Sequence, residues 1–341
     1  MWSFMEYITH SPNTMKENVW SDHTTMIEKL KTWRMVFMKL LTFINAGESR
    51  LGVKTDQGIV DVAAAAEKEG LSSPKNLLEL INQGEEGLQN VKSILSTSPD
   101  VIRDEEVQYA PPLSKPEKMI FVGLNYEKHA NEGGMPIPEK PIYFAKFANS
   151  LAGHREDIEL SDFVKQVDYE VELVVVMSKK TRNVTKEEAL DYVFGYSTGN
   201  DFSVRELQNR SSQWLFGKAH DKFAPFGPYV VTSDEVQDPQ NLDLKLWVNG
   251  ELRQNSNTAD MIFSVAEIIS DLSNIMTLEP GDVIFTGTPE GVILGMENKN
   301  WLKAGDQVVC EVEKLGSLEN VLVSGDAVSA ESKEDTFHEV K

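Results

Sequence analysis

Residues 168–176 read Asp168-Tyr-Glu-Val-Glu-Leu-Val-Val-Val, and this stretch decides how the chain folds. Its apolar and β-branched residues favour a strand, in which successive side chains point to opposite faces. Asp168, Glu170 and Glu172 then share one face, opposite valine and leucine side chains. Neighbouring carboxylates would lie about 6.7 Å apart, and each ionised pair would cost roughly 2.5 kcal/mol at an effective dielectric of about 20. The stretch alone leaves two interpretations open, a cation between the carboxylates or a solvated sheet edge.

Short apolar runs of the same kind dominate the chain after residue 110. The pattern predicts strands at 118–123, 141–146, 169–177, 228–232, 244–248, 282–286 and 307–312. Two helices stand out there, at 186–193 and 264–272. Because helices do not alternate regularly with the strands, the pattern argues against a doubly wound parallel sheet. It predicts a strand-rich α+β domain over 111–324, followed by a polar tail at 325–341.

The part of the chain before residue 111 divides into two further segments. Expected strands at 41–44, 49–53 and 58–62 precede expected helices at 63–67 and 74–95, which indicates a small α+β domain over 38–110. Pro111 and Pro112 exclude a helix in the connector that follows. Residues 1–37 hold an unusual share of the methionines and tryptophans. We interpret them as an extension, either an upstream reading of the start codon or a helix at 21–33.

Charge and cysteine usage limit the class of partner. Acidic residues outnumber basic ones by 54 to 33, which gives a net charge of −21 and makes nucleic acid and anionic membranes poor partners. No apolar stretch approaches the roughly 18 residues of a membrane span. Cys310 is the only cysteine, so no intrachain disulfide can form and a cytoplasmic location is the default. An anionic substrate would require local cations around its site.

Oxygen ligands for a metal come from two segments. A predicted strand at 195–202 ends near Asp201, where a carboxylate can reach a site beside Glu170 and Glu172. Three carboxylates without cysteine favour a hard cation, Mg²⁺ first, with Mn²⁺ or Ca²⁺ as alternatives and Zn²⁺ disfavoured.

Basic side chains follow Asp201 closely in the sequence. Arg205 and Gln208 lie three residues apart and share one face of a predicted helix, and Lys218 follows soon after. Arg205 and Lys218 would supply the positive charge that an anionic substrate needs. The alternatives are that Arg205 pairs structurally with Glu206 or Asp201 and that Lys218 is a solvated loop lysine.

A histidine and a glutamate form a candidate catalytic pair. In a helix over 126–132, His129 and Glu132 can touch, and a carboxylate beside an imidazole raises its basicity and orients it, as a general base requires. The breaker-rich segment 133–141 suits a movable cover, whereas His154 and His220 are interpreted as ordinary surface histidines. The turn at 286–292 could bind a carboxylate through its threonine hydroxyls and free amides, but no nucleotide-binding glycine loop occurs.

Taken in order, these segments resemble the fumarylacetoacetate hydrolase family over residues 111–323. The resemblance rests on Val122-Gly-Leu-Asn-Tyr-Glu-Lys-His, Asp168-Tyr-Glu-Val-Glu-Leu, Asn200-Asp-Phe-Ser-Val-Arg-Glu-Leu-Gln, Gln213-Trp-Leu-Phe-Gly-Lys, Val248-Asn-Gly-Glu-Leu-Arg-Gln and Gly281-Asp-Val-Ile-Phe-Thr-Gly-Thr-Pro-Glu-Gly-Val. It implies a mixed β-roll with a smaller N-terminal domain, assembled as a homodimer.

The resemblance also implies roles for individual residues. The matching positions are metal ligands at Glu170, Glu172 and Asp201, a water-activating pair at His129 and Glu132, a substrate-polarising lysine at Lys218, and substrate contacts at Arg205, Gln208 and Thr288. Leu124 departs from the pattern, because many relatives carry arginine there.

The resemblance implies hydrolysis of a carbon–carbon bond in a 1,3-diketo acid such as an acylpyruvate. The alternative within the same family is keto–enol tautomerisation of oxaloacetate, or isomerisation or decarboxylation of a related keto acid. A third hypothesis, from another class, is a metal-binding dimer without catalysis, which the presence of His129 and Glu132 disfavours.

Overall fold

The computed structural model describes residues 38–325. The expected extension at 1–37 and the tail beyond residue 325 therefore lie outside the described residues. Among the residues that are described, no helix is both long and apolar enough to cross a membrane.

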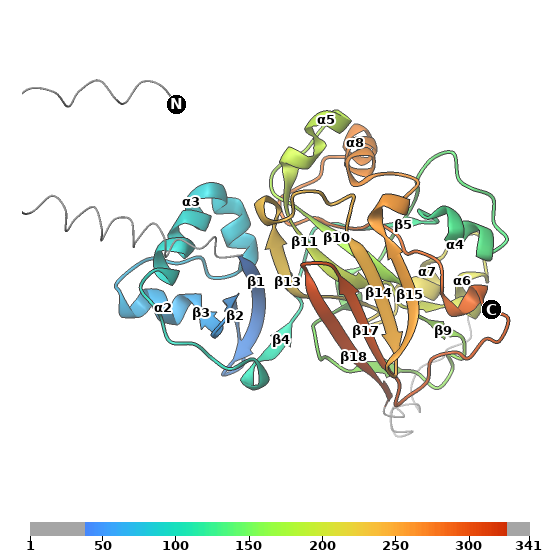
Figure 1. The fold of residues 1–341 in the computed structure, drawn as a ribbon, viewed down its shortest axis with the longest axis horizontal. Helices are drawn as coiled ribbons and strands as arrows, with labels where there is room; N and C mark the ends of the chain where they lie inside the picture. The colour runs from blue at the N-terminus through green and yellow to red at the C-terminus, as the bar shows by residue number, and fades with distance from the viewer. Residues whose placement is uncertain (1–37, 326–341) are drawn as a thin grey trace, which may run out of the picture. The chain divides into compact units, whose positions relative to one another are not determined.

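Strands dominate the fold, as the sequence predicts (Figure 1). An eleven-stranded sheet has the order β3-β2-β1-β13-β11-β10-β16-β5-β6, with β4 beside β1 and β7 beside β13. Its strands are β1 (Lys39–Asn45), β2 (Glu48–Thr55), β3 (Gly58–Asp61), β4 (Gln108–Ala110), β5 (Met119–Gly123), β6 (Ile142–Ala145), β7 (Leu151–Ala152), β10 (Val171–Met177), β11 (Val193–Asn200), β13 (Ala224–Thr232) and β16 (Val283–Phe285). Most pairs are antiparallel, but β16 runs parallel to β5 and β13 parallel to β7, so the sheet is mixed.

Two smaller sheets and seven α-helices complete the described part of the chain. One sheet has the order β15-β14-β17-β18-β8 and the other pairs β12 with β9. These strands are β8 (Ile158–Leu160), β9 (Val167–Asp168), β12 (Ser203–Val204), β14 (Asp243–Val248), β15 (Glu251–Asn257), β17 (Gln307–Val312) and β18 (Gly316–Ser324). The helices are α2 (Val62–Lys68), α3 (Leu77–Leu95), α4 (Glu127–Glu132), α5 (Lys186–Ala189), α6 (Arg205–Gln208), α7 (Leu215–Lys218) and α8 (Val265–Ile275). This arrangement confirms a strand-rich α+β fold.

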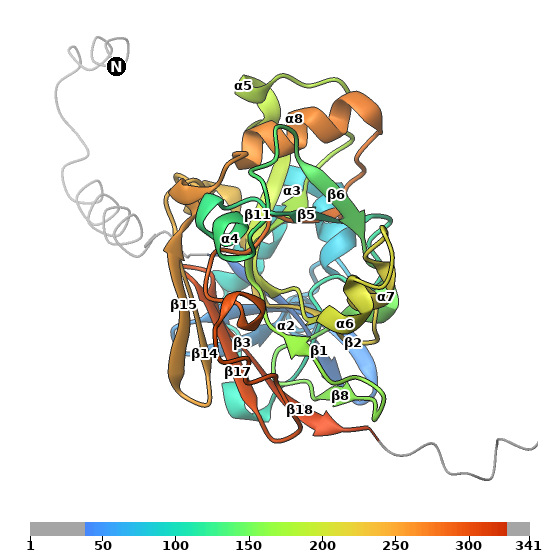
Figure 2. The ribbon, with the colours of Figure 1, turned by 90° about the vertical axis from the view of Figure 1, so that its right-hand side faces the viewer.

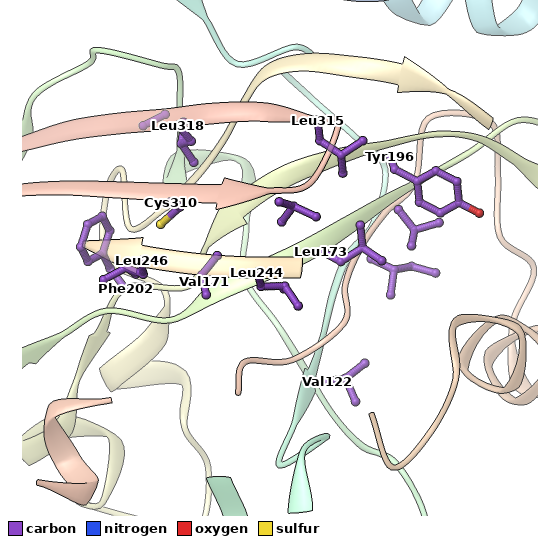
Figure 3. Packing of buried hydrophobic residues seen from close by; sticks show 14 of the residues in the cluster. Val122, Val171, Leu173, Tyr196, Phe202, Leu244, Leu246, Cys310, Leu315 and Leu318 are labelled. Atoms are coloured by element: carbon purple, nitrogen blue, oxygen red, sulfur yellow. The ribbon is translucent and has the colours of Figure 1, made fainter. Parts of the chain in front are cut away.

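The strand β10 is buried on both faces. Val171, Leu173 and Val175 join the core cluster formed with the five-stranded sheet, in which Leu244 and Leu246 also lie (Figure 3). The alternate valines of β10 join a second cluster, which includes side chains of α3 and the first strands. Each fully buried valine or leucine contributes about 1.5–3 kcal/mol, so this strand anchors both cores.

Some predicted boundaries shift for local reasons. The helix expected at 74–95 begins at Leu77, where Asn76 caps it, and is kinked at Gly84, whose φ is 57°. The helix expected at 186–193 ends at Ala189 and continues only as a 3₁₀ turn. The boundary expected at 110/111 stays a prediction, and the large sheet crosses it, because β1 pairs with β13.

Three short helices carry five of the nine predicted site residues. In Figure 2, α4 lies on one side of the face shown, and α6 and α7 lie on the other. His129 belongs to α4, Arg205 and Gln208 belong to α6, and Lys218 ends α7.

Candidate active site

The ends of two neighbouring strands bring three carboxylates together. In the antiparallel pair β10–β11, Val171 faces Asn200 and Glu172 faces Gly199, so Glu170 and Asp201 lie at the same edge. Glu170, Glu172 and Asp201 each offer an oxygen, and these oxygens lie within 4.8 Å of one another. The three side chains are 5%, 1% and 0% exposed, which rules out the solvated sheet edge.

The predicted strand begins later than expected, at Val171, because its first backbone groups bond to side chains. The N–H of Glu170 donates to Asn200 Oδ1 (2.9 Å), and that of Val171 donates to Gln254 Oε1 (2.9 Å). The carbonyl of Glu170 still accepts the backbone N–H of Asp201 (2.9 Å), which keeps the two residues side by side just beyond the strand.

The two predicted cations lie directly against this cluster. Lys218 Nζ donates to Glu170 Oε2 and Asp201 Oδ2, both at 2.7 Å, and the lysine is 2% exposed. It is therefore not a solvated loop lysine. Burial opposes its charged form, but the carboxylates of Asp201 and Glu170 outweigh this and raise the pKa of Lys218.

Arg205 spans two acidic residues rather than the partners considered from the sequence. Its Nε donates to Asp168 Oδ2 (2.9 Å) and its Nη2 to Glu170 Oε1 (2.7 Å). Its Nη1 donates to Gln208 Oε1 (2.8 Å), so the two residues expected on one helical face do meet. Despite the opposing effect of burial, Lys218 and Arg205 hold the pKa of Glu170 well below its usual range.

Glu172 is the member of the cluster without a cationic partner among the described residues. Its Oε2 accepts one hydrogen bond, from the backbone N–H of Gly287 (2.7 Å). Burial, followed by the charges of Asp201 and Glu170, raises its pKa well above the ordinary value. A buried carboxylate in this situation requires a cation or a proton, so the residues present fit a hard divalent metal.

In the turn after β16, the hydroxyl of Thr286 and the N–H of Gly287 already donate hydrogen bonds within the protein, so neither is free for a substrate. Thr286 Oγ1 donates to Leu173 O (2.9 Å), and the Gly287 N–H is used by Glu172. Gly287 has a φ of 95°, and a Cβ there would lie 2.7 Å from Asn125, so only glycine fits. Thr288 alone of this turn lines the pocket as predicted, and its Oγ1 accepts from Gln254 Nε2 (2.9 Å).

A buried lysine that the sequence analysis did not identify completes the cluster. Lys146, directly after β6, forms an ion pair with Asp201 Oδ1 and donates to Phe202 O (2.9 Å) and Phe223 O (2.7 Å). Burial lowers its pKa to about 8. The sequence could have indicated Lys146, because it directly follows the apolar run 141–145 and a charged side chain at the end of a strand can enter a site.

The predicted catalytic pair is in contact. His129 Nδ1 lies 3.1 Å from Glu132 Oε1 on α4. The N–H of Gly291 donates to both oxygens of Glu132, at 3.1 and 3.0 Å, and so fixes the carboxylate. With Nδ1 directed at Glu132, Nε2 is the ring nitrogen available to a substrate.

One pocket collects these groups. It is lined by Val122, Gly123, Leu124, His129, Met135, Phe144, Glu170, Glu172, Arg205, Gln208, Asn209, Trp214, Lys218, Thr288 and Leu294. Met135 comes from the segment expected to cover the site. The pocket thus combines charged and polar side chains with apolar walls, and its lining cations are Arg205 and Lys218.

The described residues contain two further histidines, His154 and His220, which lie in different surroundings. His154 is buried, accepts the N–H of Glu319 at Nδ1 (3.1 Å) and packs edge-on against Tyr109, so its interpretation as a surface histidine is wrong. Burial lowers its pKa to about 4, which keeps it neutral. The Nε2 atom of His220 lies 2.7 Å from the backbone oxygen of Phe216. Neither His154 nor His220 lines the pocket.

Asp168 supports the site without belonging to the carboxylate trio. Besides Arg205, it accepts the backbone N–H groups of Ile293 (2.8 Å) and Leu294 (3.0 Å), and it is fully buried. We expect Asp168→Ala to lower the free energy of unfolding by about 3–5 kcal/mol, because it removes one of the two carboxylates that pair with the buried Arg205 and leaves two backbone N–H groups without their acceptor. Urea denaturation measures this loss, and an unchanged midpoint would contradict it.

Comparison with known proteins gives concordant results. The model of the fumarylacetoacetate (FAA) hydrolase C-terminal family matches residues 118–323. The chain is 39% identical over 292 residues to the mitochondrial oxaloacetate tautomerase of Xenopus laevis, covering 84% of this chain and 90% of the relative.

Two solved structures are similar over nearly the same region. Fumarylacetoacetate hydrolase from Exiguobacterium antarcticum has a TM-score of 0.72 and 35% identity, covering 84% of this chain and 100% of the other. Maleylpyruvate hydrolase from Sphingobium sp. SYK-6, in complex with manganese(II) and pyruvate, has a TM-score of 0.70 and 32% identity, with the same coverage.

Proposed function

The chain belongs to the fumarylacetoacetate hydrolase family, and from this premise we propose that it is a divalent-metal-dependent enzyme that interconverts the keto and enol forms of oxaloacetate or a similar 2-keto acid. The observation that carries the proposal is one pocket lined by an oriented imidazole, two cations and two carboxylates of the acidic cluster, Glu170 and Glu172. The names of relatives such as the Xenopus enzyme favour tautomerisation over the carbon–carbon hydrolysis expected first from the sequence.

Glu170, Glu172 and Asp201 would hold the metal, with Mg²⁺ or Mn²⁺ as the preferred ion. When bound, the metal supplies Lewis acidity that stabilises negative charge on the oxygens of a keto acid. Glu172 supports this assignment, because it has no cationic partner among the described residues and a metal ion beside it would compensate its charge.

His129 would move the proton. In the keto-to-enol direction its Nε2 removes a proton from the carbon beside the carbonyl, and the electron pair forms the carbon–carbon double bond. The carbonyl oxygen gains the negative charge and is then protonated; the reverse sequence converts the enol to the ketone. Glu132 holds the ring in the required orientation and stabilises its protonated form.

Lys218 and Arg205 would bind the anionic substrate in this acidic protein. Lys218 donates to Glu170 and Asp201 in this structure and lines the pocket. With a metal held by those two carboxylate oxygens, its ammonium would turn to the developing oxyanion. Gln208 accepts from Arg205 through Oε1, so its amide NH₂ is available to a substrate carboxylate. Thr288, on the same pocket wall, is a further substrate contact.

Hydrolysis of an acylpyruvate is the second candidate function. It is supported by the same pair, since His129 held by Glu132 could deprotonate a water molecule. The similarity to a maleylpyruvate hydrolase that binds manganese and pyruvate also favours it. Decarboxylation of oxaloacetate would use the same pocket.

One experiment separates these functions. The protein is stripped with a chelator and restored with Mg²⁺ or Mn²⁺, and enol-oxaloacetate, acetylpyruvate and fumarylpyruvate are followed by ultraviolet absorbance with product identification. Metal-dependent loss of the enol signal with oxaloacetate intact supports the tautomerase. Release of pyruvate from the acylpyruvates would contradict the tautomerase proposal and support the hydrolase. Binding of metal without turnover of any of these substrates supports a catalytically idle protein.

Assembly and location are further parts of the proposal. We infer a homodimer from the family resemblance, which light scattering of the full chain tests. The lone cysteine favours a reducing compartment, such as the cytoplasm. The Xenopus relative, however, is named as mitochondrial. Imaging of a C-terminally tagged full chain distinguishes the two compartments.

A further inference from the structure

The three candidate metal ligands share a feature beyond their proximity. Each has one carboxylate oxygen already bound by a group of the protein. Glu170 Oε1 accepts from Arg205, Glu172 Oε2 accepts from the Gly287 N–H, and Asp201 Oδ1 pairs with Lys146. The second oxygen of Glu170 and that of Asp201 accept from Lys218 (2.7 Å each). Each carboxylate therefore has at most one oxygen to offer a cation, and Glu170 and Asp201 offer theirs only when Lys218 moves away.

Lys146 is the most firmly fixed of these partners. Its side chain is fully buried, and its three ammonium protons are directed to Asp201, Phe202 O and Phe223 O. The ammonium also lies 5.4 Å from the centre of the Phe121 ring. Lys146 does not line the pocket, so no substrate or metal can draw it away from Asp201 by a simple side-chain rotation into the cleft.

Lys218 differs from Lys146 in this respect. It holds Glu170 Oε2 and Asp201 Oδ2, but it lines the pocket and has a flexible four-carbon stem. It can therefore leave these two oxygens to a divalent cation and turn towards the substrate. The oxygens paired with Arg205 and Lys146 face fixed positive charges instead, which exclude a second cation.

The number of available oxygens bears on the choice of metal. Ca²⁺ takes about 6–8 oxygen ligands and commonly binds carboxylates through both oxygens, whereas Mg²⁺ and Mn²⁺ accept six and readily keep water or substrate in the remaining positions. Three carboxylates restricted to one oxygen each suit the six-coordinate ions.

We propose that Lys146 makes this site selective for Mg²⁺ and Mn²⁺ over Ca²⁺, by keeping Asp201 restricted to a single ligating oxygen. Lys146 is thus a positioning residue that acts through Asp201. The inference rests on the proposed metal site but not on the reaction catalysed there.

The test compares metal preference, not activity. Full-length protein stripped with chelator is titrated calorimetrically with MnCl₂ and, separately, with CaCl₂. Removing the charge of Lys146 alters the repulsion of both ions to a similar extent, so the ratio of the two dissociation constants isolates the geometric effect. Lys146→Met should reduce the preference for Mn²⁺ by about tenfold or more, the usual size of such outer-sphere effects.

Lys118→Met is the matched control. Lys118 also pairs with a buried carboxylate, Asp282 (3.1 Å), but it precedes β5, whereas the pocket is at the other end of that strand. This variant should lose stability and keep the wild-type Mn²⁺/Ca²⁺ ratio. If Lys146→Met keeps that ratio too, Lys146 is only structural and the proposal is overturned.

The wild-type protein provides a test that does not depend on the folding of a variant. Equal affinity for Mn²⁺ and Ca²⁺ overturns the selectivity, and binding of neither ion overturns the metal site itself. If the protein clearly prefers Mn²⁺ but turns over no keto acid, the proposed metal selectivity is supported and the proposed enzymatic function is contradicted.

Discussion

Replacing His129 with alanine is expected to lower the metal-dependent tautomerisation rate by about 10²–10⁴-fold, the range for loss of a general acid–base group. The position of the imidazole in the pocket is fixed, since Glu132 contacts its Nδ1 and is itself held by the Gly291 N–H. Steady-state assay of enol-oxaloacetate with saturating Mn²⁺ measures the loss.

Two controls show whether the loss of activity in His129→Ala reflects proton transfer rather than metal binding. Mn²⁺ affinity should stay near the wild-type value, because His129 is not among the three clustered carboxylates. Glu132→Gln should give a smaller loss, since the ring keeps a hydrogen-bonding neighbour but loses the charge that stabilises its protonated form. Wild-type turnover by His129→Ala would show that another group moves the proton.

Replacing Glu172 with glutamine is expected to have two opposite effects. It removes one of three candidate ligands, so Mn²⁺ binding and metal-dependent activity should be abolished. In metal-free protein the same change should raise the free energy of unfolding by roughly 1–3 kcal/mol, because it relieves a buried carboxylate with too few partners. The single hydrogen bond from Gly287, together with the raised pKa of Glu172, is the basis for this expectation.

Calorimetry with Mn²⁺ and urea denaturation in chelator measure the two effects separately. Asp201→Asn is the comparison, because Asp201 has ammonium partners on both oxygens and its replacement breaks these pairs. It should lose metal binding and stability together. A Glu172→Gln protein that is less stable than wild type without metal would contradict the assignment of Glu172 as the uncompensated carboxylate.

Local pattern accounts for much of the fold. Alternation of apolar residues predicted β14 and β17 closely, because a strand that packs on one core repeats with a period of two. The strands β1 and β5 were predicted as short apolar runs instead, and successive residues of both are buried. Prediction was poorer where side chains replace backbone partners. The N–H of Glu170 donates to the side chain of Asn200, and no local signal in residues 168–176 reports that bond.

Residue types at short spacing in the sequence were enough to name the candidate metal ligands and the candidate catalytic pair. The sequence by itself also brought His129 to Glu132 and Arg205 to Gln208, since helical geometry sets contacts three residues apart. Only the tertiary structure decided that the carboxylates are buried, that Arg205 pairs with Asp168, and that Lys146 lies against Asp201. Those contacts join segments far apart in the chain, and the pairing of β10, β11 and β13 places them, through an order of strands that no local periodicity encodes.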